Sequence, residues 1–421
     1  MTRIFLVLVA AFAFVLNSHS QDYADQIRKD TRKAAGNLFP YEIEPGQDTP
    51  APKGYEPFYI SHYGRHGSRY FDDQMIVDEV NSKITALAGL DIFTDAGKAY
   101  YSELRQVLDE HEGMTGFLTS LGAREQKGIA ARTASRFPEV FSGKEGRRTV
   151  INVSSKVPRC MLSMTNFAHS LERSTTGLEF TFDAGEKYQR YIAYKPEGLH
   201  PRHWASHLDD SLRRARMNPE ATFSHFFTDV QKVKEVVGDI YGFERDLYLF
   251  SCSGHLTDCG HDLLSHFPTD ILIANYRMRN PRFYLAYGMT GRYSDYIRAV
   301  AAPLVRDFVA RADEALSEGS SVAADFRFGH DTAMLPFMCC VGMEGMDKEL
   351  DLDTVNALWQ SFRMMHMASN LQMVFYSDGK GDVLVKLLYN EKETRIPALK
   401  PLSGPYYRWS DLRQYLLDRI S

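Results

Sequence analysis

The sequence of 421 residues contains little cysteine, and it has no excess of basic residues. Five cysteines are too few and too unevenly placed for a disulfide framework, which excludes the small disulfide-stapled folds. With a formal net charge of −5, the chain has no general positive field that would favour nucleic acid or an anionic membrane as a partner. An anionic substrate would therefore have to be attracted by arginines gathered at one site.

Long hydrophobic runs are also scarce, and the one that stands out lies at the N-terminus. Ile4 to Leu16 is unbroken and apolar, Arg3 precedes it, and Ser18 and Ser20 follow it. A membrane-spanning helix needs about 20 apolar residues, so this run is too short, and its order is that of a secretory signal. We expect residues 1–20 to be a signal peptide, no membrane span, and a protein exported to the periplasm or the extracellular space.

The most informative stretch is residues 61–70, Ser-His-Tyr-Gly-Arg-His-Gly-Ser-Arg-Tyr, which follows an apolar segment that predicts a strand. Its glycines allow a sharp turn and a close approach to a ligand. Arg65 and Arg69 flank His66, and arginine is the preferred partner for phosphate or carboxylate oxygens. The plainer interpretation is a basic loop with an exposed histidine. However, four fixed residues in this order arise by chance only about a few times in a thousand chains.

Two further predicted strands end in charged residues. Residues 147–155 alternate and are rich in Val and Ile, and they lead to Arg159. Residues 322–328 form the other strand, which ends at His330-Asp331. In layered α/β sheets, ligands bind beyond the carboxyl ends of the strands. We therefore expect the three strand ends to converge at one site.

Strands alternate with helical spacing along most of the chain, which predicts an α/β fold. We expect a three-layer α/β/α core with a mostly parallel sheet, formed by residues 21–165 and 294–421. Residues 166–293 have weaker periodicity and are expected to form an inserted, mainly helical cap. Helices are predicted at 72–90, 94–112, 122–137, 160–171, 294–316 and 352–368, and a hairpin at 371–376 and 383–389.

The residues at these strand ends suit the hydrolysis of a phosphate monoester. That reaction needs a nucleophile in line with the ester oxygen, cations around the phosphoryl oxygens and an acid for the leaving alkoxide. His66 suits the nucleophile and Asp331 the acid, and the groups suited to binding phosphate are Arg65, Arg69, Arg159 and His330. No metal or other cofactor is required, because the arginines supply the positive charge. Taken singly, Arg159 could start a helix and Asp331 could cap one.

The Arg-His-Gly-Ser-Arg loop, with the later His330-Asp331 and Arg159 between them, resembles the histidine acid phosphatases. That family includes acid phosphatases, phytases and inositol polyphosphate phosphatases. The resemblance implies His66 as the nucleophile, Asp331 as the proton donor, and Arg65, Arg69, Arg159 and His330 as phosphate ligands. It covers most of the chain after residue 50 and is poor across 175–293.

Two features separate this chain from parts of that family. Tyr70 and Phe71 replace the end of the usual loop pattern, which has a proline two residues after the second arginine. The inositol polyphosphate branch usually carries His-Ala-Glu where this chain has His330-Asp331, yet residues 383–391 are similar to that branch. The reaction is therefore better specified than the substrate.

The expected function is an exported phosphomonoesterase that acts through a phosphohistidine on a small anionic phosphate ester, with phytate or other inositol polyphosphates as the leading substrates. A general acid phosphatase of broad specificity is the alternative within the same chemistry. A mutase-like phosphotransferase shares the nucleophile, but the signal peptide and the His-Asp pair argue against it. A non-catalytic protein that binds phosphate ligands at the surface is the remaining alternative.

Other motifs are left open or assigned plainer roles. Cys252 and Cys259 could close a small disulfide loop in an oxidising compartment, which the sequence does not decide. The surrounding Cys252, His255, Cys259, His261 and His266 are all possible zinc ligands, but their spacing matches no common structural site. We interpret the basic runs 213–216 and 277–282 as solvated faces, of which part could line the cap.

Overall fold

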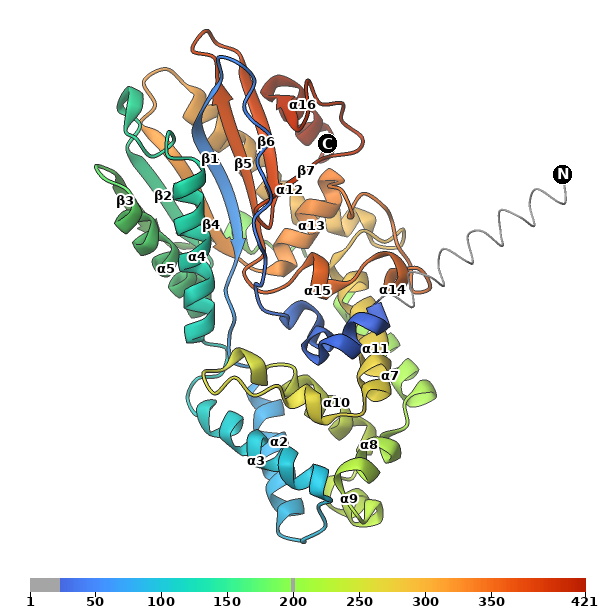
Figure 1. Ribbon diagram of the computed structural model, residues 1–421. Helices are drawn as coiled ribbons and strands as arrows, with labels where there is room; N and C mark the ends of the chain where they lie inside the picture. Colours follow the sequence, from blue (N-terminus) through green and yellow to red (C-terminus); the bar gives the residue numbers. More distant parts are fainter. Residues whose placement is uncertain (1–22, 198–200) are drawn as a thin grey trace, which may run out of the picture.

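The computed structural model describes residues 23–197 and 201–421. Figure 1 shows two lobes, an upper one built on a β-sheet and a lower one built from helices. The predicted signal peptide, residues 1–20, lies outside the described residues. Along the described chain, no helix combines the length and the apolar character that a membrane crossing requires.

The strands of the upper lobe form one mixed sheet within the described residues. In chain order they are β1 (Glu56–Arg65), β2 (Thr149–Ser154), β3 (Glu179–Asp183), β4 (Val322–Gly329), β5 (Asn370–Ser377), β6 (Val383–Tyr389), β7 (Lys392–Thr394) and β8 (Tyr406–Arg408). Their order in space is β3, β2, β4, β1, β5, β6 and β7, with β8 paired to β6. β3, β2, β4 and β1 are parallel, and the predicted hairpin, β5 and β6, adds the antiparallel part. The predicted α/β class is confirmed.

The helices in chain order are η1 (Thr31–Leu38), α2 (Gln74–Ala88), α3 (Asp95–Glu110), α4 (Ser120–Arg136), η2 (Lys144–Gly146), α5 (Pro158–Ser174), α6 (Glu186–Ile192), α7 (Pro201–Arg216), α8 (Pro219–Phe226), α9 (Val230–Val237), α10 (Ile240–Ser251), η3 (Gly254–Leu256), η4 (Leu263–His266), α11 (Thr269–Tyr287), α12 (Ser294–Leu316), α13 (Asp331–Val341), α14 (Val355–Leu358), α15 (Ser361–Met364) and α16 (Trp409–Asp418). Most of the long predicted helices are present within two residues of their expected bounds. The helix predicted at 352–368 is wrong. Only α14 and α15 form there, because the chain is extended at Trp359 and Gln360 and enters the left-handed region at Ala368.

Helices cover both faces of the sheet, which gives the core three layers (Figure 1). α4 and α5 pack on one face, where they bury Ile60 and Phe326. α12, α13 and α16 pack on the other face, where they bury Tyr59 and Phe375. The central strand β1 lies between β4 and β5 and is buried along most of its length. Because β1 is buried, the position of its last residue, Arg65, is fixed, and so is the start of the loop that carries His66.

The lower lobe has an apolar cluster of its own, to which α2, α3, α8, α9, α10 and η1 contribute. Tyr100, Phe226 and Phe267 are in mutual ring contact within it. α11 joins the two lobes, since Tyr276 belongs to this cluster and Tyr284 to the cluster beneath the sheet.

The predicted division into a core of residues 21–165 and 294–421 and a cap of 166–293 stays a prediction. The packing favours other boundaries. α2 and α3 pack in the lower lobe although they precede residue 165, and β3 pairs with β2 although it follows residue 166. We propose that the cap consists of α2 and α3 together with α7 to α11.

Candidate active site

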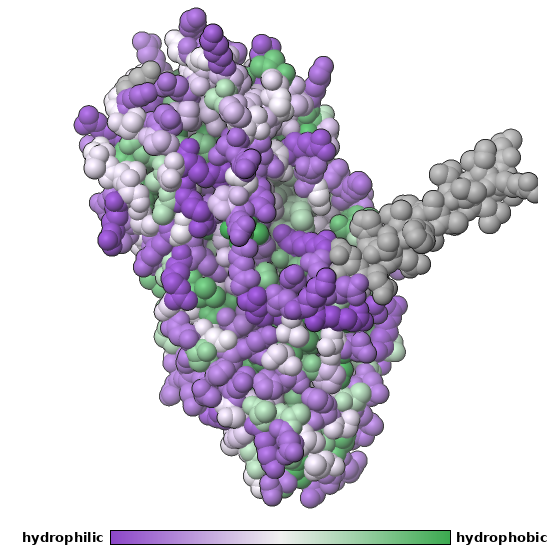
Figure 2. All heavy atoms as spheres, viewed as in Figure 1, coloured by the Kyte–Doolittle hydropathy of each residue, from purple (hydrophilic) through white to green (hydrophobic). Residues whose placement is uncertain are grey.

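The carboxyl ends of β1 and β4 lie side by side and face the lower lobe. Arg65 is in register with Gly329, and the backbone N–H of His66 donates to the carbonyl oxygen of Gly329 at 3.0 Å. The rings of His66 and His330 consequently lie 5.5 Å apart, centroid to centroid. Two of the three predicted strand ends, those of β1 and β4, thus lie next to each other. Figure 2 shows hydrophilic side chains gathered between the two lobes on this face of the molecule.

The loop after β1 is held by the first turns of α4. The Glu125 carboxylate accepts hydrogen bonds from the Ser68 N–H at 2.7 Å and from the Ser68 hydroxyl at 2.7 Å, and Gln126 donates to the carbonyl oxygen of Arg65 at 2.9 Å. Gly67 and Gly122 allow the two backbones to touch. A Cβ on Gly67 would overlap the backbone of Gly122, and a Cβ on Gly122 would overlap that of Ser68. These glycines serve close approach, and neither has a positive φ.

The ring of His66 is held in one tautomer. Its Nδ1 lies 2.9 Å from the carbonyl oxygen of Gly67, and since a carbonyl only accepts, Nδ1 carries the proton. The lone pair is then on Nε2. Burial lowers the pKa of His66 well below its ordinary value, and the charges of Arg159 and Arg65 lower it further. The ring therefore stays neutral in acid, as a nucleophile must.

Three arginines surround this ring. Arg65 is 1% exposed and Arg69 is 8% exposed, and burial lowers the pKa of Arg69 to about 10, so that it stays charged. Asp72 lies between Arg69 and Arg159. Arg69 Nη2 is 2.9 Å from Asp72 Oδ1, and Arg159 Nη2 is 3.6 Å from Asp72 Oδ2. Arg159 stands in the first turn of α5, which begins with Pro158. The three guanidinium groups concentrate positive charge on a chain whose net charge is negative.

Asp331 is the first residue of α13, but its carboxylate does not cap that helix. Oδ2 accepts from Arg65 Nη2 at 2.8 Å and from Asn37 Nδ2 at 2.9 Å. Burial raises the pKa of Asp331, and Arg65 and Asn37 oppose that effect strongly enough to leave the pKa below its ordinary value. In the unliganded protein the group is therefore a carboxylate.

His330 completes the group of predicted residues. Its backbone N–H donates to Tyr63 Oη at 3.0 Å, its Nε2 lies 3.2 Å from Ser155 Oγ, and the Cys160 thiol lies 3.6 Å from the same nitrogen. Burial lowers the pKa of His330 to about 4, and the charge of Arg159 adds to the shift. His330 is thus a neutral hydrogen-bonding group above that pH.

Part of the chain matches a known protein family. Residues 210–390 match the model of the histidine phosphatase superfamily (branch 2). That segment contains His330 and Asp331 and lies after the His66 loop. Over that segment the chain is similar to this superfamily branch. No curated protein sequence matches the chain.

Solved structures of similar fold span nearly the whole of this chain. The multiple inositol polyphosphate phosphatase of Bifidobacterium longum, in complex with inositol hexasulfate, matches with a TM-score of 0.71 and 20% identity over 91% of this chain and 97% of that one. The phytase of D. castellii matches with a TM-score of 0.67 and 14% identity over 93% and 85%. The phytase of Hafnia alvei matches with 0.54 and 12% over 88% and 98%. At these identities the likeness concerns the fold.

The structure brings all the predicted residues of the candidate site together, and it adds residues that the sequence did not predict. These are Asn37, Asp72, Glu125, Gln126 and Cys160. Glu125 had a detectable signal, because Leu118-Thr119-x-x-Gly122 begins a helix and Glu125 lies one turn after Gly122. Asn37 had none, since it stands 28 residues before Arg65 in the N-terminal segment.

The cysteine and histidine cluster of residues 252–266 does not converge. His255 faces the carbonyl oxygen of Leu38, and His261 and His266 both lie near Glu103. Among the described residues, no group of three or more His, Cys, Asp or Glu side chains is arranged to hold a metal ion. Cys252 and Cys259 are free thiols in the structure.

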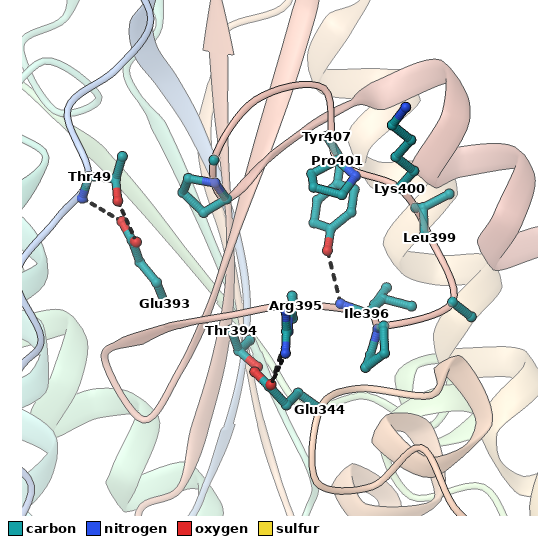
Figure 3. A pocket seen from close by; sticks show the side chains of 14 residues that line it. Thr49, Glu344, Glu393, Thr394, Arg395, Ile396, Leu399, Lys400, Pro401 and Tyr407 are labelled. Atoms are coloured by element: carbon teal, nitrogen blue, oxygen red, sulfur yellow. Dashed lines mark hydrogen bonds and ion pairs between the residues drawn. The ribbon is translucent and has the colours of Figure 1, made fainter.

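A large surface groove lies away from the candidate site. It has a volume of about 780 Å³ and is lined mainly by residues 393–401, 404, 405 and 407, together with Thr49 and Glu344 (Figure 3). Three of its charged side chains have partners, since Arg395 meets Glu344, and Glu393 accepts from Thr49. It contains none of the residues of the site.

Proposed function

We propose that this chain is an exported phosphomonoesterase that hydrolyses phosphate esters through a phosphohistidine on His66. The observation that supports it most is the state of the His66 ring. Nδ1–H is engaged by the carbonyl oxygen of Gly67, the ring is neutral, and Nε2 is left as a nucleophile among three arginines. A buried, neutral histidine beside fixed positive charge is suited to attack on phosphorus. Its lowered pKa makes it a weak general base.

In the first step, His66 Nε2 attacks the phosphorus atom. The P–N bond forms as the ester P–O bond breaks, and the leaving alkoxide takes a proton from Asp331. Arg65, Arg69 and Arg159 stabilise the negative charge on the phosphoryl oxygens, with His330 as a further hydrogen-bond partner. These groups are held in place before the substrate arrives, which spares reorganisation during the reaction.

In the second step, water attacks the phosphohistidine and Asp331 takes up one of its protons. The P–N bond breaks, inorganic phosphate leaves, and Asp331 is again protonated. A bound phosphoryl group places negative charge beside Asp331 and competes for Arg65, and both effects raise the pKa of Asp331. The pair Arg65–Asp331 in the unliganded protein is thus compatible with an acid role in the complex.

We propose inositol polyphosphates, phytate included, as the substrate class. The support is the fold shared with an inositol polyphosphate phosphatase and with phytases, together with the similarity of residues 383–391 to the inositol branch. We also propose export, on the basis of the N-terminal run.

The test is the release of inorganic phosphate from phytate and from p-nitrophenyl phosphate at pH 4.5 by the mature protein and by His66→Ala. We expect release from both substrates by the parent, and none above background by the variant. Release from the aryl ester alone would leave a general acid phosphatase. No release from either ester by a folded parent that binds phosphate would favour a binding protein.

A further inference from the structure

Asn37, at the end of η1, contacts three groups of the site at once. Its side-chain Nδ2 donates to Asp331 Oδ2 at 2.9 Å. Its Oδ1 accepts from Arg279 Nη2 at 3.1 Å. Its backbone carbonyl oxygen accepts from Arg65 Nη1 at 2.5 Å. An N-terminal residue therefore links the proton donor, the phosphate clamp and the cap helix α11.

The chemistry of its neighbours allows the Asn37 amide only one orientation. A guanidinium group only donates hydrogen bonds, so the amide oxygen must face Arg279. An ionised carboxylate only accepts them, so the NH₂ group must face Asp331. A flipped amide would set two donors against each other at Arg279 and two acceptors against each other at Asp331. Arg279 thus determines which end of Asn37 meets the proton donor.

This orientation makes the two oxygens of Asp331 unequal. Oδ2 accepts two N–H groups, from Arg65 Nη2 and from Asn37 Nδ2. A proton on Oδ2 would face both donors and would cost at least one of those hydrogen bonds. Oδ1 accepts none of the hydrogen bonds from these two residues, and it is the oxygen on which a proton costs least.

We propose that Asn37 is a positioning residue that directs the catalytic proton to Asp331 Oδ1, and that Arg279 of the cap acts through Asn37 to keep it there. This inference rests on the proposed function, because it assigns a role within the same reaction. It makes a helix of the lower lobe part of the proton-donating apparatus of the upper lobe. Arg279 is suited to this role because its side chain is partly buried and its Nη2 donates directly to Asn37 Oδ1.

The first experiment compares two leaving groups in Asn37→Ala. Nitrophenolate leaves without a proton, whereas the alkoxide of an alkyl phosphate such as β-glycerophosphate requires one. We expect kcat on the alkyl phosphate to fall about 10- to 100-fold and kcat on p-nitrophenyl phosphate to change less than about threefold. Inhibition by inorganic phosphate should change less than about twofold, since the Asn37 carbonyl that meets Arg65 is retained.

The second experiment is a double-mutant cycle between Asn37→Ala and Arg279→Gln. We expect Arg279→Gln to slow the alkyl phosphate selectively, and to cause no further loss when Asn37 is already alanine. Arg277→Gln is the matched control, because Arg277 stands on the same helix and its Nε donates to Tyr23 Oη, away from the site. That control should behave as the parent on both substrates.

Each other outcome contradicts the proposal. Equal losses on both substrates in Asn37→Ala, or independent and additive losses in the cycle, would mean that Asn37 or Arg279 supports the site in another way. If Asn37→Ala does not fold, the Arg279→Gln variant alone tests the proposal, since it leaves Asn37 in place. A rise in KM on both substrates in Arg279→Gln, without a dependence on the leaving group, would overturn the inference. A parent that cleaves neither ester would instead refute the proposed function.

Discussion

At the scale of single residues, the neutrality of His66 is the property on which chemistry in acid depends. An ordinary histidine, with a pKa near 6.5, would be mostly protonated at pH 4.5 and would have no lone pair to attack with. Here burial and the neighbouring arginines lower the pKa of His66 far enough to avoid this. The arginines that we propose as phosphate ligands therefore also keep the proposed nucleophile neutral.

A pH profile tests this directly. Because the pKa of His66 is lowered, protonation of the nucleophile begins well below 6.5, so kcat/KM should not fall as the pH is reduced from 6.5 to 4.5. Above about pH 6 the substrate loses its second phosphate proton and its charge changes, whereas the ionisation of Asp331 does not affect this profile, because nitrophenolate leaves without a proton. We expect kcat/KM for p-nitrophenyl phosphate to be largest in acid. A decline on the acid side with a midpoint near 6.5 would show an ordinary histidine.

The role of Asp331 as an acid can be tested with two substrates whose leaving groups differ in their need for a proton. Asp331→Asn keeps the size of the side chain but cannot supply a proton to the leaving alkoxide. We expect kcat on an alkyl phosphate to fall about 100-fold or more, and kcat on p-nitrophenyl phosphate to fall much less. Initial rates of the two substrates under saturating conditions give the ratio. Equal losses on both would contradict the assignment of Asp331 as the acid.

At the scale of the elements, the position of the His66 loop depends on contact between two backbones. Gly67 lies against Gly122 at the start of α4, and neither has room for a Cβ. The glycines of the loop were predicted from the sequence as a means to turn sharply, whereas the structure shows that Gly67 serves close packing on a helix. Nothing in the sequence near Gly67 indicates which helix that is.

Gly67→Ala should push the loop away from α4 and misplace His66. A displacement of about 1 Å in a reacting group costs about 100-fold in rate, so we expect a loss of kcat of at least that order. Gly46→Ala is the matched control, since a Cβ there would meet Lys392 only at ordinary contact distances, 3.5 Å or more. Thermal unfolding of both variants, measured beside their rates, distinguishes a displaced loop from an unfolded protein. Parent-like activity in Gly67→Ala would show that the loop tolerates the shift.

The sequence predicted elements and site residues where a local pattern carried them. Strand periodicity located β1, β2 and β4, and the charged residues at their ends were the predicted site. The helix expected at 352–368 failed because tertiary contacts override its spacing: Trp359 is fully buried in the cluster beneath the sheet and Met367 in that of the lower lobe. The basic runs were interpreted as solvated, yet Arg213 is 4% exposed and pairs with the buried Glu244. Long-range pairing of this kind leaves no local trace.

At the scale of the whole molecule, two lobes with separate apolar clusters meet at a site that needs both. By our proposal the sheet supplies the nucleophile and the acid, while Asn37 of η1 contacts both Asp331 and Arg279 of α11. The interior of both lobes also holds buried histidines whose pKa is lowered by burial. They are His62, with a pKa of about 3, and His255 and His366, each with a pKa of about 4.

These histidines make stability depend on pH. The folded protein keeps them neutral, whereas the unfolded chain takes up their protons below about pH 6.5. Their contribution is therefore present above pH 6.5 and is lost as the pH falls towards the folded pKa. Buried carboxylates act in the opposite sense, since burial raises the pKa of Glu125 and Asp325. The protein works best in acid, by our proposal, at the expense of part of its stability.

His62 isolates the histidine contribution. It is 1% exposed and its ring contacts Phe167, Phe326 and Phe328. In His62→Phe the titrating group is gone and the aromatic packing is retained, while every buried carboxylate remains. Between pH 7 and pH 4.5 the free energy of unfolding of the parent should fall by about 2.5 kcal/mol more than that of the variant. Urea unfolding at the two pH values measures this difference. Equal losses in parent and variant would mean that His62 has the same pKa in the folded and the unfolded protein. The acid sensitivity of the fold would then arise from other groups.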